Sequence, residues 1–358
     1  MASVEDGLSG VDAVGPDETG EQIEGFRREI YLDVSGDPET CVTELRFRAP
    51  RAQPDRGEES GMTGADGETL DFYVTPGPMT DLAGVPAGVL DGLSTDPVAV
   101  CRRVPGVLVH EYWAGSYGVE VPERRLNELR ARSAVEMVDA IQQLHAGPLT
   151  VARPPEQRMV GNCRHFSTLS TALLRRAGIP ARARCGFAAY FEPGRHVDHW
   201  VTEYWSAARR RWVRIDAQLD EVQRAAIAPD FDTEDMPDGP FLPAGDAWQR
   251  CRRGEADPAT FGILEFWGLW FVQANVVRDL AALNKMELLP WDVWGPMKFR
   301  TELDDGTVSL TDSVAGVLMA GDTEAVRRLY QGSDELRVPG QVFDARFEVV
   351  HALPKPGA

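Results

Sequence analysis

A stripe of apolar side chains runs through residues 163–177. Apolar residues recur there at steps of three and four, the period of one buried helical face, at Phe166, Leu169, Leu173 and Ala177. Gly178 supplies a left-handed stop, and Pro180 prevents the helix from continuing. The pattern therefore predicts a helix that begins at Cys163.

Two strands are predicted shortly after this helix. Residues 199–205 and 211–216 are rich in β-branched and aromatic side chains, and a short polar turn separates them. We expect these runs to be neighbouring antiparallel strands. His199 begins the first strand and Asp216 ends the second, so the two side chains should lie across from each other within hydrogen-bonding distance.

Further elements are predicted on both sides of this region. An amphipathic helix is expected at Arg124 to Leu144 and a long aromatic-rich helix at Phe261 to Leu289. Shorter elements are expected as follows: strands at Arg28 to Val34, Cys41 to Phe47 and Gln341 to Val350, and helices at Ser313 to Ala320 and Thr323 to Gln331. The last strand is expected to pair with one of the N-terminal strands.

The organisation along the chain is that of one core extended at both ends. Loose segments are expected at residues 50–68 and 230–246, which are acidic and rich in glycine or proline. The predicted parts are a disordered acidic N-terminus (1–22), an N-terminal elaboration (23–120), a catalytic core (121–225), and an aromatic-rich helical and C-terminal elaboration (226–358).

The side chains of Cys163, His199 and Asp216 form a set suited to nucleophilic catalysis. A thiol at the first turn of a helix meets unpaired N–H groups and the positive end of the helix dipole, which favour the thiolate. An adjacent imidazole can take the thiol proton and return it to a leaving group. A carboxylate on the other ring nitrogen fixes the tautomer and stabilises the imidazolium.

Four short motifs occur in order around these residues. They are Gly161-x-Cys163-x-x-Phe166, the helix end Leu174-Arg-Arg-Ala-Gly-Ile-Pro180, His199-x-x-x-Glu203, and Trp212-Val-x-x-Asp216. With these motifs, residues 155 to 220 resemble the transglutaminase-like superfamily of the bacterial type. The resemblance implies an α+β, papain-like fold, in which a helix bearing the cysteine packs on an antiparallel sheet bearing the histidine and aspartate.

One departure from the family pattern concerns the first strand. The family commonly has tryptophan two places after the histidine, whereas Trp200 directly follows His199. Counting back from Glu203 still selects His199, but the strand could be locally adjusted. His196 is the alternative base, although its offset from Glu203 does not fit. His165 should point to the other face of the helix and have a structural role or lie at the rim of the site.

A metal site is the main alternative chemistry. Cys163, Cys185, His196 and His199 are suitable ligand types, but they lack the paired spacing typical of zinc sites. No calcium-binding loop of EF-hand type occurs either. We therefore expect no metal and no cofactor.

Two sets of residues are candidates for substrate binding. The backbone N–H of Cys163 is the expected first donor to a developing oxyanion, and Gln157 or Asn162 could supply the second, with Gln157 preferred. Both could equally be ordinary loop residues. Trp200, Trp267 and Trp270 are candidates for an apolar pocket, although aromatic residues at helical spacing are more often part of a core.

Composition limits the classes of partner. The formal charge of −19 argues against nucleic acid and anionic membranes as partners. Five scattered cysteines are typical of a reduced cytoplasmic protein, and no stretch resembles a signal peptide or an apolar span of about 18 residues. Lysine occurs only at 285, 298 and 355.

The expected function is cysteine-dependent acyl transfer through a thioester, forming or exchanging an amide on a small molecule or peptide. The donor could also be a thioester bound to a carrier. Hydrolysis of an amide by a peptidase or amidase is the alternative within the enzymes, and a catalytically inactive binding module is the alternative outside them. The sequence leaves the donor, the acceptor and the oligomeric state open.

Overall fold

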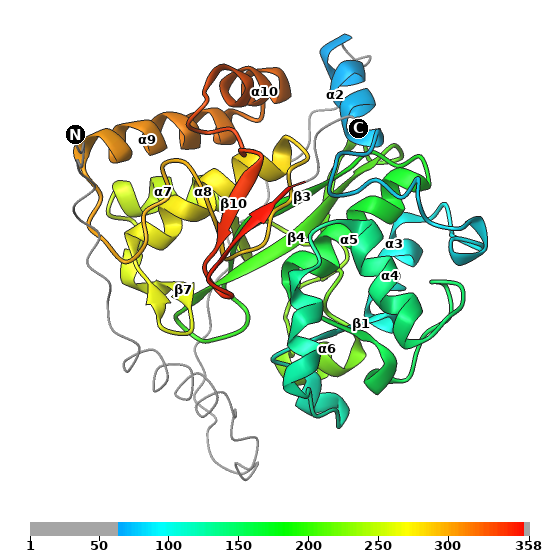
Figure 1. Ribbon diagram of the computed structural model, residues 1–358. Coiled ribbons are helices and arrows are strands. Elements are labelled where there is room, and N and C mark those ends of the chain that lie inside the picture. Colours follow the sequence, from blue (N-terminus) through cyan, green and yellow to red (C-terminus); the bar gives the residue numbers. More distant parts are fainter. Residues whose placement is uncertain (1–63, 354–358) are drawn as a thin grey trace, which may run out of the picture. The chain divides into compact units, whose positions relative to one another are not determined.

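The computed structural model describes residues 64–353, which are coloured in Figure 1. They lie within one compact unit. The strands predicted at 28–34 and 41–47 and the acidic segment 1–22 lie outside the described residues. Helices and sheets are mixed in the described part, which confirms the α+β class.

The central sheet is built on three consecutive strands, β3 (Ala181–Ala188), β4 (His196–Ser206) and β5 (Arg211–Ile215), which pair antiparallel. Three short strands complete it: β6 (Phe241–Pro243), β7 (Phe261–Ile263) and β8 (Phe266–Trp267). The order is β6-β3-β4-β7-β8, with β5 also on β4. The predicted antiparallel strands are therefore confirmed, and the register of β3 with β4 continues without a bulge past Trp200.

One edge of β4 has a gap in its pairing. β3 occupies the other edge, where it pairs with residues 197–204. On the gapped edge, β7 pairs with residues 196–197 and β5 with residues 202–206. Residues 198–201 therefore have no partner strand on this edge, and His199 lies within that stretch.

The helix predicted at Cys163 is confirmed as α5 (Cys163–Arg176). Its end is a Schellman motif, because the Ile179 N–H donates to the Leu174 carbonyl at 2.9 Å and the Gly178 N–H donates to Arg175 at 3.0 Å. Gly178 adopts a φ of 78°, the left-handed conformation that the sequence predicted for it.

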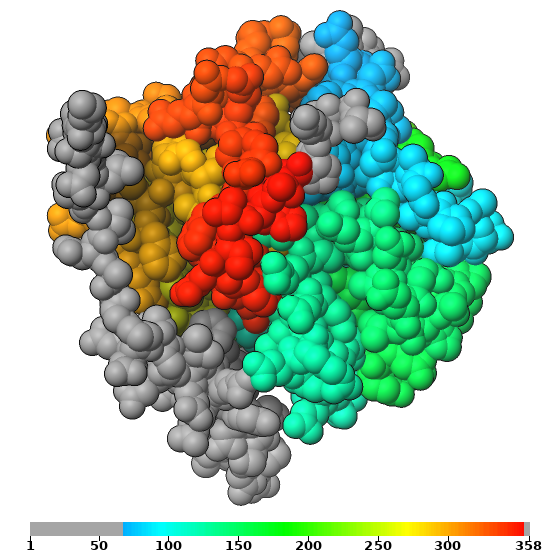
Figure 2. Space-filling view, viewed as in Figure 1, coloured from blue at the N-terminus to red at the C-terminus, as the bar shows by residue number. Residues whose placement is uncertain are grey.

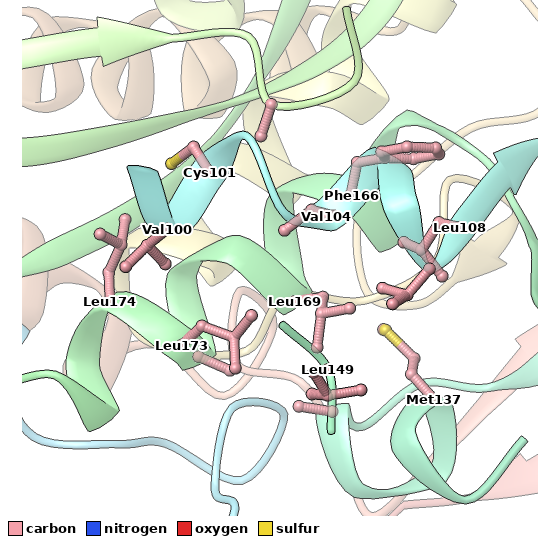
Figure 3. Close-up of a cluster of buried hydrophobic side chains, with 14 of the residues drawn as sticks. Val100, Cys101, Val104, Leu108, Met137, Leu149, Phe166, Leu169, Leu173 and Leu174 are labelled. Carbon is pink, nitrogen blue, oxygen red and sulfur yellow. The ribbon is translucent and has the colours of Figure 1, made fainter. Parts of the chain in front are cut away.

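Helix α5 packs on β4 and is the centre of the first hydrophobic cluster. Its apolar stripe contacts α3 (Pro97–Cys101) and α4 (Ala134–Leu144). Figure 3 shows Phe166, Leu169, Leu173 and Leu174 of α5 among these side chains. Burying this stripe fixes the rotation of α5, and with it the position of Cys163 at its first turn.

A second hydrophobic cluster lies on the other side of the β3 and β4 ribbons in Figure 1. It is formed largely by four helices: α7 (Ala244–Arg252), α8 (Leu269–Leu283), α9 (Asp305–Ala320) and α10 (Thr323–Gly332). The helix predicted at 323–331 is confirmed by α10. The helix predicted at 313–320 is longer than expected, because Asp304 caps its start by accepting a hydrogen bond from the Thr307 N–H at 2.8 Å.

Smaller elements connect these layers. They are α2 (Gly64–Val74), α6 (Glu221–Ile227), β1 (Leu108–His110), β2 (Met159–Gly161), β9 (Asp292–Val293), β10 (Gln341–Asp344), β11 (Val349–Ala352), and the 3-10 turns η1 (Ala87–Val89), η2 (Val104–Gly106), η3 (Ala114–Tyr117), η4 (Glu123–Arg130), η5 (Pro155–Gln157) and η6 (Pro258–Thr260). Strands β1 and β2 pair parallel, away from the central sheet.

The aromatic-rich helix predicted at 261–289 is wrong in its first part. Residues 261–267 form the β7–β8 hairpin, and α8 begins only at Leu269. Gly262 and Gly268 have φ values of 158° and 118°, which a regular helix cannot contain.

The helix predicted at 124–144 is also interrupted. Residues 123–130 form the 3-10 turn η4, and α4 starts anew at Ala134. Ser133 and Glu136 form a capping box at this start, which satisfies N–H groups that a continuous helix would have used.

Three further expectations need correction. The loose segment 50–68 ends in helix, since α2 begins at Gly64, and the loop 230–246 contains β6. The single strand predicted at 341–350 is the hairpin β10–β11. It pairs with β9, and the N-terminal strands expected to pair with it lie outside the described residues.

This C-terminal sheet is tied to the core by a buried cation. Arg132, just before α4, donates to Asp292 of β9 and Asp344 of β10, each at 2.7 Å, and all three side chains are almost fully buried. In Figure 2 the hairpin, in red, lies on the surface between the green residues and the yellow and orange C-terminal helices.

Helix α2 is held by Lys285, one of the rare lysines. Its ammonium donates to the Thr75 hydroxyl at 2.7 Å and lies 4.0 Å from the centre of the Phe72 ring. Among the helices of residues 64–353, none is long and apolar enough to cross a membrane.

Candidate active site

Cys163 is the first residue of α5 and is only 6% exposed. It packs with Ala183, Cys185, Trp200 and Ala282 in a small buried cluster. Burial raises the pKa of the thiol well above its usual value, and the carboxylates of Asp198 and Asp216 raise it further.

Backbone hydrogen bonds at the Cys163 sulfur partly oppose this effect. They come from Trp200 and Arg164, and they lower the thiol pKa because they favour the thiolate. The helix position therefore acts as the sequence predicted, but burial is the larger effect. In this closed site the thiol favours its protonated form and requires a base to ionise it.

His199 and Asp216 are brought together as predicted. The His199 Nε2 lies 2.9 Å from Asp216 Oδ2, and both side chains are almost fully buried. The Tyr190 hydroxyl donates to the same oxygen at 2.6 Å, and the Gln218 N–H donates to Oδ1 at 3.0 Å. Burial alone would raise the pKa of Asp216, but His199 and these hydrogen bonds hold it below its usual value.

Two aromatic side chains of the β3–β4 loop enclose the imidazole. The rings of Phe191 and Tyr190 lie 4.9 and 5.9 Å from the His199 ring centre. With Nε2 engaged by Asp216, Nδ1 is the nitrogen left to receive a proton from sulfur. Within residues 64–353 no hydrogen bond joins this ring to the thiol of Cys163, so proton transfer requires the two side chains to approach.

The first two turns of α5 make hydrogen bonds with the unpaired stretch of β4. Cys163 takes a hydrogen bond from the backbone of Trp200, and Ser167 donates to the Val201 carbonyl at 2.7 Å. The backbone groups of Trp200 and Val201 that form these hydrogen bonds lie in the stretch 198–201, which β5 and β7 leave unpaired. The start of α5 therefore contacts Trp200 and Val201, the two residues that follow His199 on β4.

The alternatives to His199 and to a triad are placed elsewhere. The ring of His196 stacks on that of Phe261, with ring centres 4.2 Å apart. Its Nδ1 lies 3.3 Å from the Thr260 hydroxyl. His165 is fully buried, which lowers its pKa well below the usual value, and its Nδ1 lies 2.8 Å from Asn162 Oδ1. His165 is thus structural rather than at a rim. No metal-binding group of His, Cys, Asp and Glu occurs in the described range.

The two predicted oxyanion candidates differ in their surroundings. Asn162 is the N-cap of α5, and its side chain contacts His165. Gln157 ends the turn η5, and its Oε1 is buried without a hydrogen-bond partner. Their oxyanion role stays a prediction.

Of the three pocket tryptophans, only Trp200 lies beside Cys163, with its indole N–H buried and unpartnered. Trp270 packs on Phe266 and Phe299 in the second hydrophobic cluster. Trp267 lies on β8, outside the cluster of Cys163, and its indole N–H donates to the Leu264 carbonyl.

Sequence reasoning missed His110, which ends β1. It lies opposite Gly161, just before α5, and stacks on Phe166 of that helix, and the charges of His199 and Asp216 act on its pKa. Next to it, Glu111 forms an ion pair of 2.7 Å with Arg346 in the turn of the C-terminal hairpin. The sequence signal was weak, because His110 follows an ordinary apolar run.

Comparisons with known proteins agree with the expected family. Residues 132–217 match the model of the transglutaminase-like superfamily. A candidate cysteine protease from Cytophaga hutchinsonii is 18% identical over 43% of each chain, with a TM-score of 0.28. Red sea bream transglutaminase is 16% identical over 36% of this chain and 22% of its own, with a TM-score of 0.25. The chain thus spans less than half of either neighbour, and comparison with curated proteins finds no match.

Proposed function

This chain carries a core of the transglutaminase-like superfamily, and on that premise we propose that it is a cysteine enzyme that transfers acyl groups through a thioester. The observation that supports the proposal is the pair His199–Asp216 at 2.9 Å, set in the unpaired stretch of β4 against which Cys163 packs. A thiol with a raised pKa and a base aligned by a carboxylate are complementary, because neither the thiolate nor the imidazolium is stable alone in a buried site.

The proposed reaction has two halves. The Cys163 thiol gives its proton to His199 Nδ1, and sulfur adds to the acyl carbon of the donor. The tetrahedral intermediate collapses, the bond to the leaving group breaks, and the leaving group takes the proton from His199. An acceptor amine then attacks the thioester, its proton passes to His199, and the thiolate leaves and is reprotonated. Asp216 keeps Nδ1 oriented and stabilises the imidazolium in both halves.

Burial of the site supports transfer to an amine over hydrolysis. Cys163 is 6% and His199 is 1% exposed, so bulk water has little access to the thioester. Exclusion of water protects a reactive intermediate until a bound acceptor arrives. We propose as donor a small amide, ester or thioester, free or held on a peptide or carrier.

Intact-mass analysis tests the proposal directly. The protein is offered a glutamine peptide, a plain ester and a pantetheine thioester in separate reactions, and each leaves a distinct acyl mass on Cys163. Adding a primary amine should release the adduct as an amide faster than buffer releases it as an acid.

The matched control is Cys163→Ser, which keeps the volume of the site. An adduct that forms on this variant at the wild-type rate would remove Cys163 from the mechanism. Release of the acid at the same rate with and without amine would replace transfer by hydrolysis.

A further inference from the structure

The parallel pair β1–β2 aligns His110 with the segment that precedes the nucleophile. In the register of this pair, His110 lies opposite Gly161, two residues before Cys163. The Glu111 N–H donates to the Gly161 carbonyl at 2.9 Å and fixes this alignment. The strand end that carries His110 is therefore attached to the segment that leads into α5.

A backbone hydrogen bond determines which nitrogen of His110 carries the proton. The Tyr112 N–H donates to His110 Nδ1 at 3.1 Å, so Nδ1 acts as an acceptor. The proton of the neutral ring is then on Nε2, which is a donor. Burial, together with the neighbouring His199, lowers the pKa of His110 to about 3, so the ring is neutral near pH 7.

The ring of His110 also contacts the helix that begins at Cys163. It stacks on Phe166 of α5, with ring centres 6.4 Å apart. His199 and Asp216 are near enough for their charges to act on its pKa, and the charge of Cys163 acts on the adjacent Tyr112. His110 thus contacts α5 three residues after Cys163, and the charges of the carboxylate–imidazole pair act on its pKa.

We propose that His110 is a catalytic residue, which donates a hydrogen bond from Nε2 to the oxyanion of the tetrahedral intermediate. This assignment rests on the proposed function. When sulfur adds to the acyl carbon, the carbonyl π pair moves to oxygen, and that oxygen accepts hydrogen bonds from His110 Nε2 and the Cys163 backbone N–H. A neutral, preorganised donor suits this role, because it stabilises the charge only where it develops. His110 thereby takes the place for which Gln157 and Asn162 were considered.

Two reactions of Cys163 separate this role from others. Acylation by p-nitrophenyl acetate passes through an oxyanion, whereas alkylation by iodoacetamide needs the thiolate but forms no oxyanion. His110→Met keeps similar volume without a donor, and His110→Gln keeps a side-chain N–H. We expect His110→Met to slow acylation about 100- to 1,000-fold and to leave alkylation within about twofold of wild type. His110→Gln should restore part of the acylation rate, and His196→Ala should change neither reaction.

The outcomes separate the role of His110 from the proposed function of the protein. Equal acylation by wild type and His110→Met, with matching melting curves, would overturn the role of His110 alone. A parallel loss of acylation and alkylation would also overturn it, since His110 would then act on thiol ionisation. Absence of any acyl adduct on wild-type Cys163 would overturn the proposed function and this assignment together.

Discussion

A single oxygen of Asp216 accepts hydrogen bonds from both His199 and Tyr190. The tyrosine comes from the β3–β4 loop, and with the adjacent Phe191 it closes over the imidazole. In the proposed mechanism Tyr190 is therefore a positioning residue, because its hydrogen bond holds the orientation of Asp216. At the scale of residues, the site combines an imidazole–carboxylate pair with a buried thiol whose raised pKa favours the protonated form.

Removing the imidazole of His199 tests whether the thiol of Cys163 depends on it for ionisation. We expect His199→Ala to slow the alkylation of Cys163 by iodoacetamide near pH 7 about 100-fold or more, because the buried thiol loses its base. The control is His196→Ala, on the same strand, which should react like wild type. Alkylation of His199→Ala at the wild-type rate would mean that another group ionises the thiol.

The two states of His110 predict a pH dependence of stability. Its pKa is about 3 in the folded protein and about 6.5 when unfolded. Since the folded value is the lower one, the neutral ring contributes stability that is present above pH ~6.5 and is lost as the pH falls toward 3.

In that window each pH unit should cost about 1.4 kcal/mol for this ring. Urea unfolding at several pH values from 6.5 to 4 measures the slope. His110→Gln should show a slope shallower by about this amount, and identical slopes would contradict the burial of a neutral histidine.

At the scale of elements, the sequence pattern was sufficient to predict a helix or strand where local residue types decide its structure. The apolar stripe and Gly178 predicted α5 and its end, and the β-branched and aromatic residues at 199–205 predicted β4, although the strand begins earlier, at His196. The aromatic residues near 266–271 mimic a helical period, but Gly262 and Gly268 turn the chain into a hairpin first. His110 could not be found from sequence, because parallel pairing of β1 with β2 brings it to Gly161 from a distant segment.

The strand opposite His199 has no room for a side chain at Gly186. A Cβ there would lie 2.2 Å from the Leu242 carbonyl oxygen of β6. We expect Gly186→Ala to destabilise the protein by about 1–3 kcal/mol, since backbone must move. Gly316→Ala is the matched control, because a Cβ within α9 meets nothing within 4 Å and should stabilise by ~0.5–1 kcal/mol. Chemical denaturation measures both, and equal effects would contradict the close approach of β6.

At the scale of the whole molecule, the second hydrophobic cluster and the C-terminal sheet extend the core well beyond the residues that match the family. The Glu111–Arg346 pair connects the C-terminal hairpin to the strand end beside His110. Arg132 connects the same hairpin and β9 to the start of α4. The C-terminal elements are thus part of the structure around the site.

Breaking the Arg132 centre should therefore affect global stability. Arg132→Leu leaves Asp292 and Asp344 buried and without their cation, which we expect to cost about 3–5 kcal/mol. Arg328→Ala removes an exposed ion pair with Glu324 and should cost no more than about 0.5 kcal/mol. Thermal and urea unfolding of the two variants make the comparison, and similar losses would contradict the buried network.

The anchoring of α2 by Lys285 has a consequence for self-modification. Burial lowers the pKa of this amine to about 8, so it loses its proton more readily than an ordinary lysine. Yet its nitrogen is held by Thr75 and enclosed against Phe72, out of reach of another molecule's acyl-enzyme. Of the two lysines that the structure describes, only Lys298 offers an accessible amine. In the proposed transfer reaction, isopeptide bonds within residues 64–353 should therefore form at Lys298 rather than at Lys285.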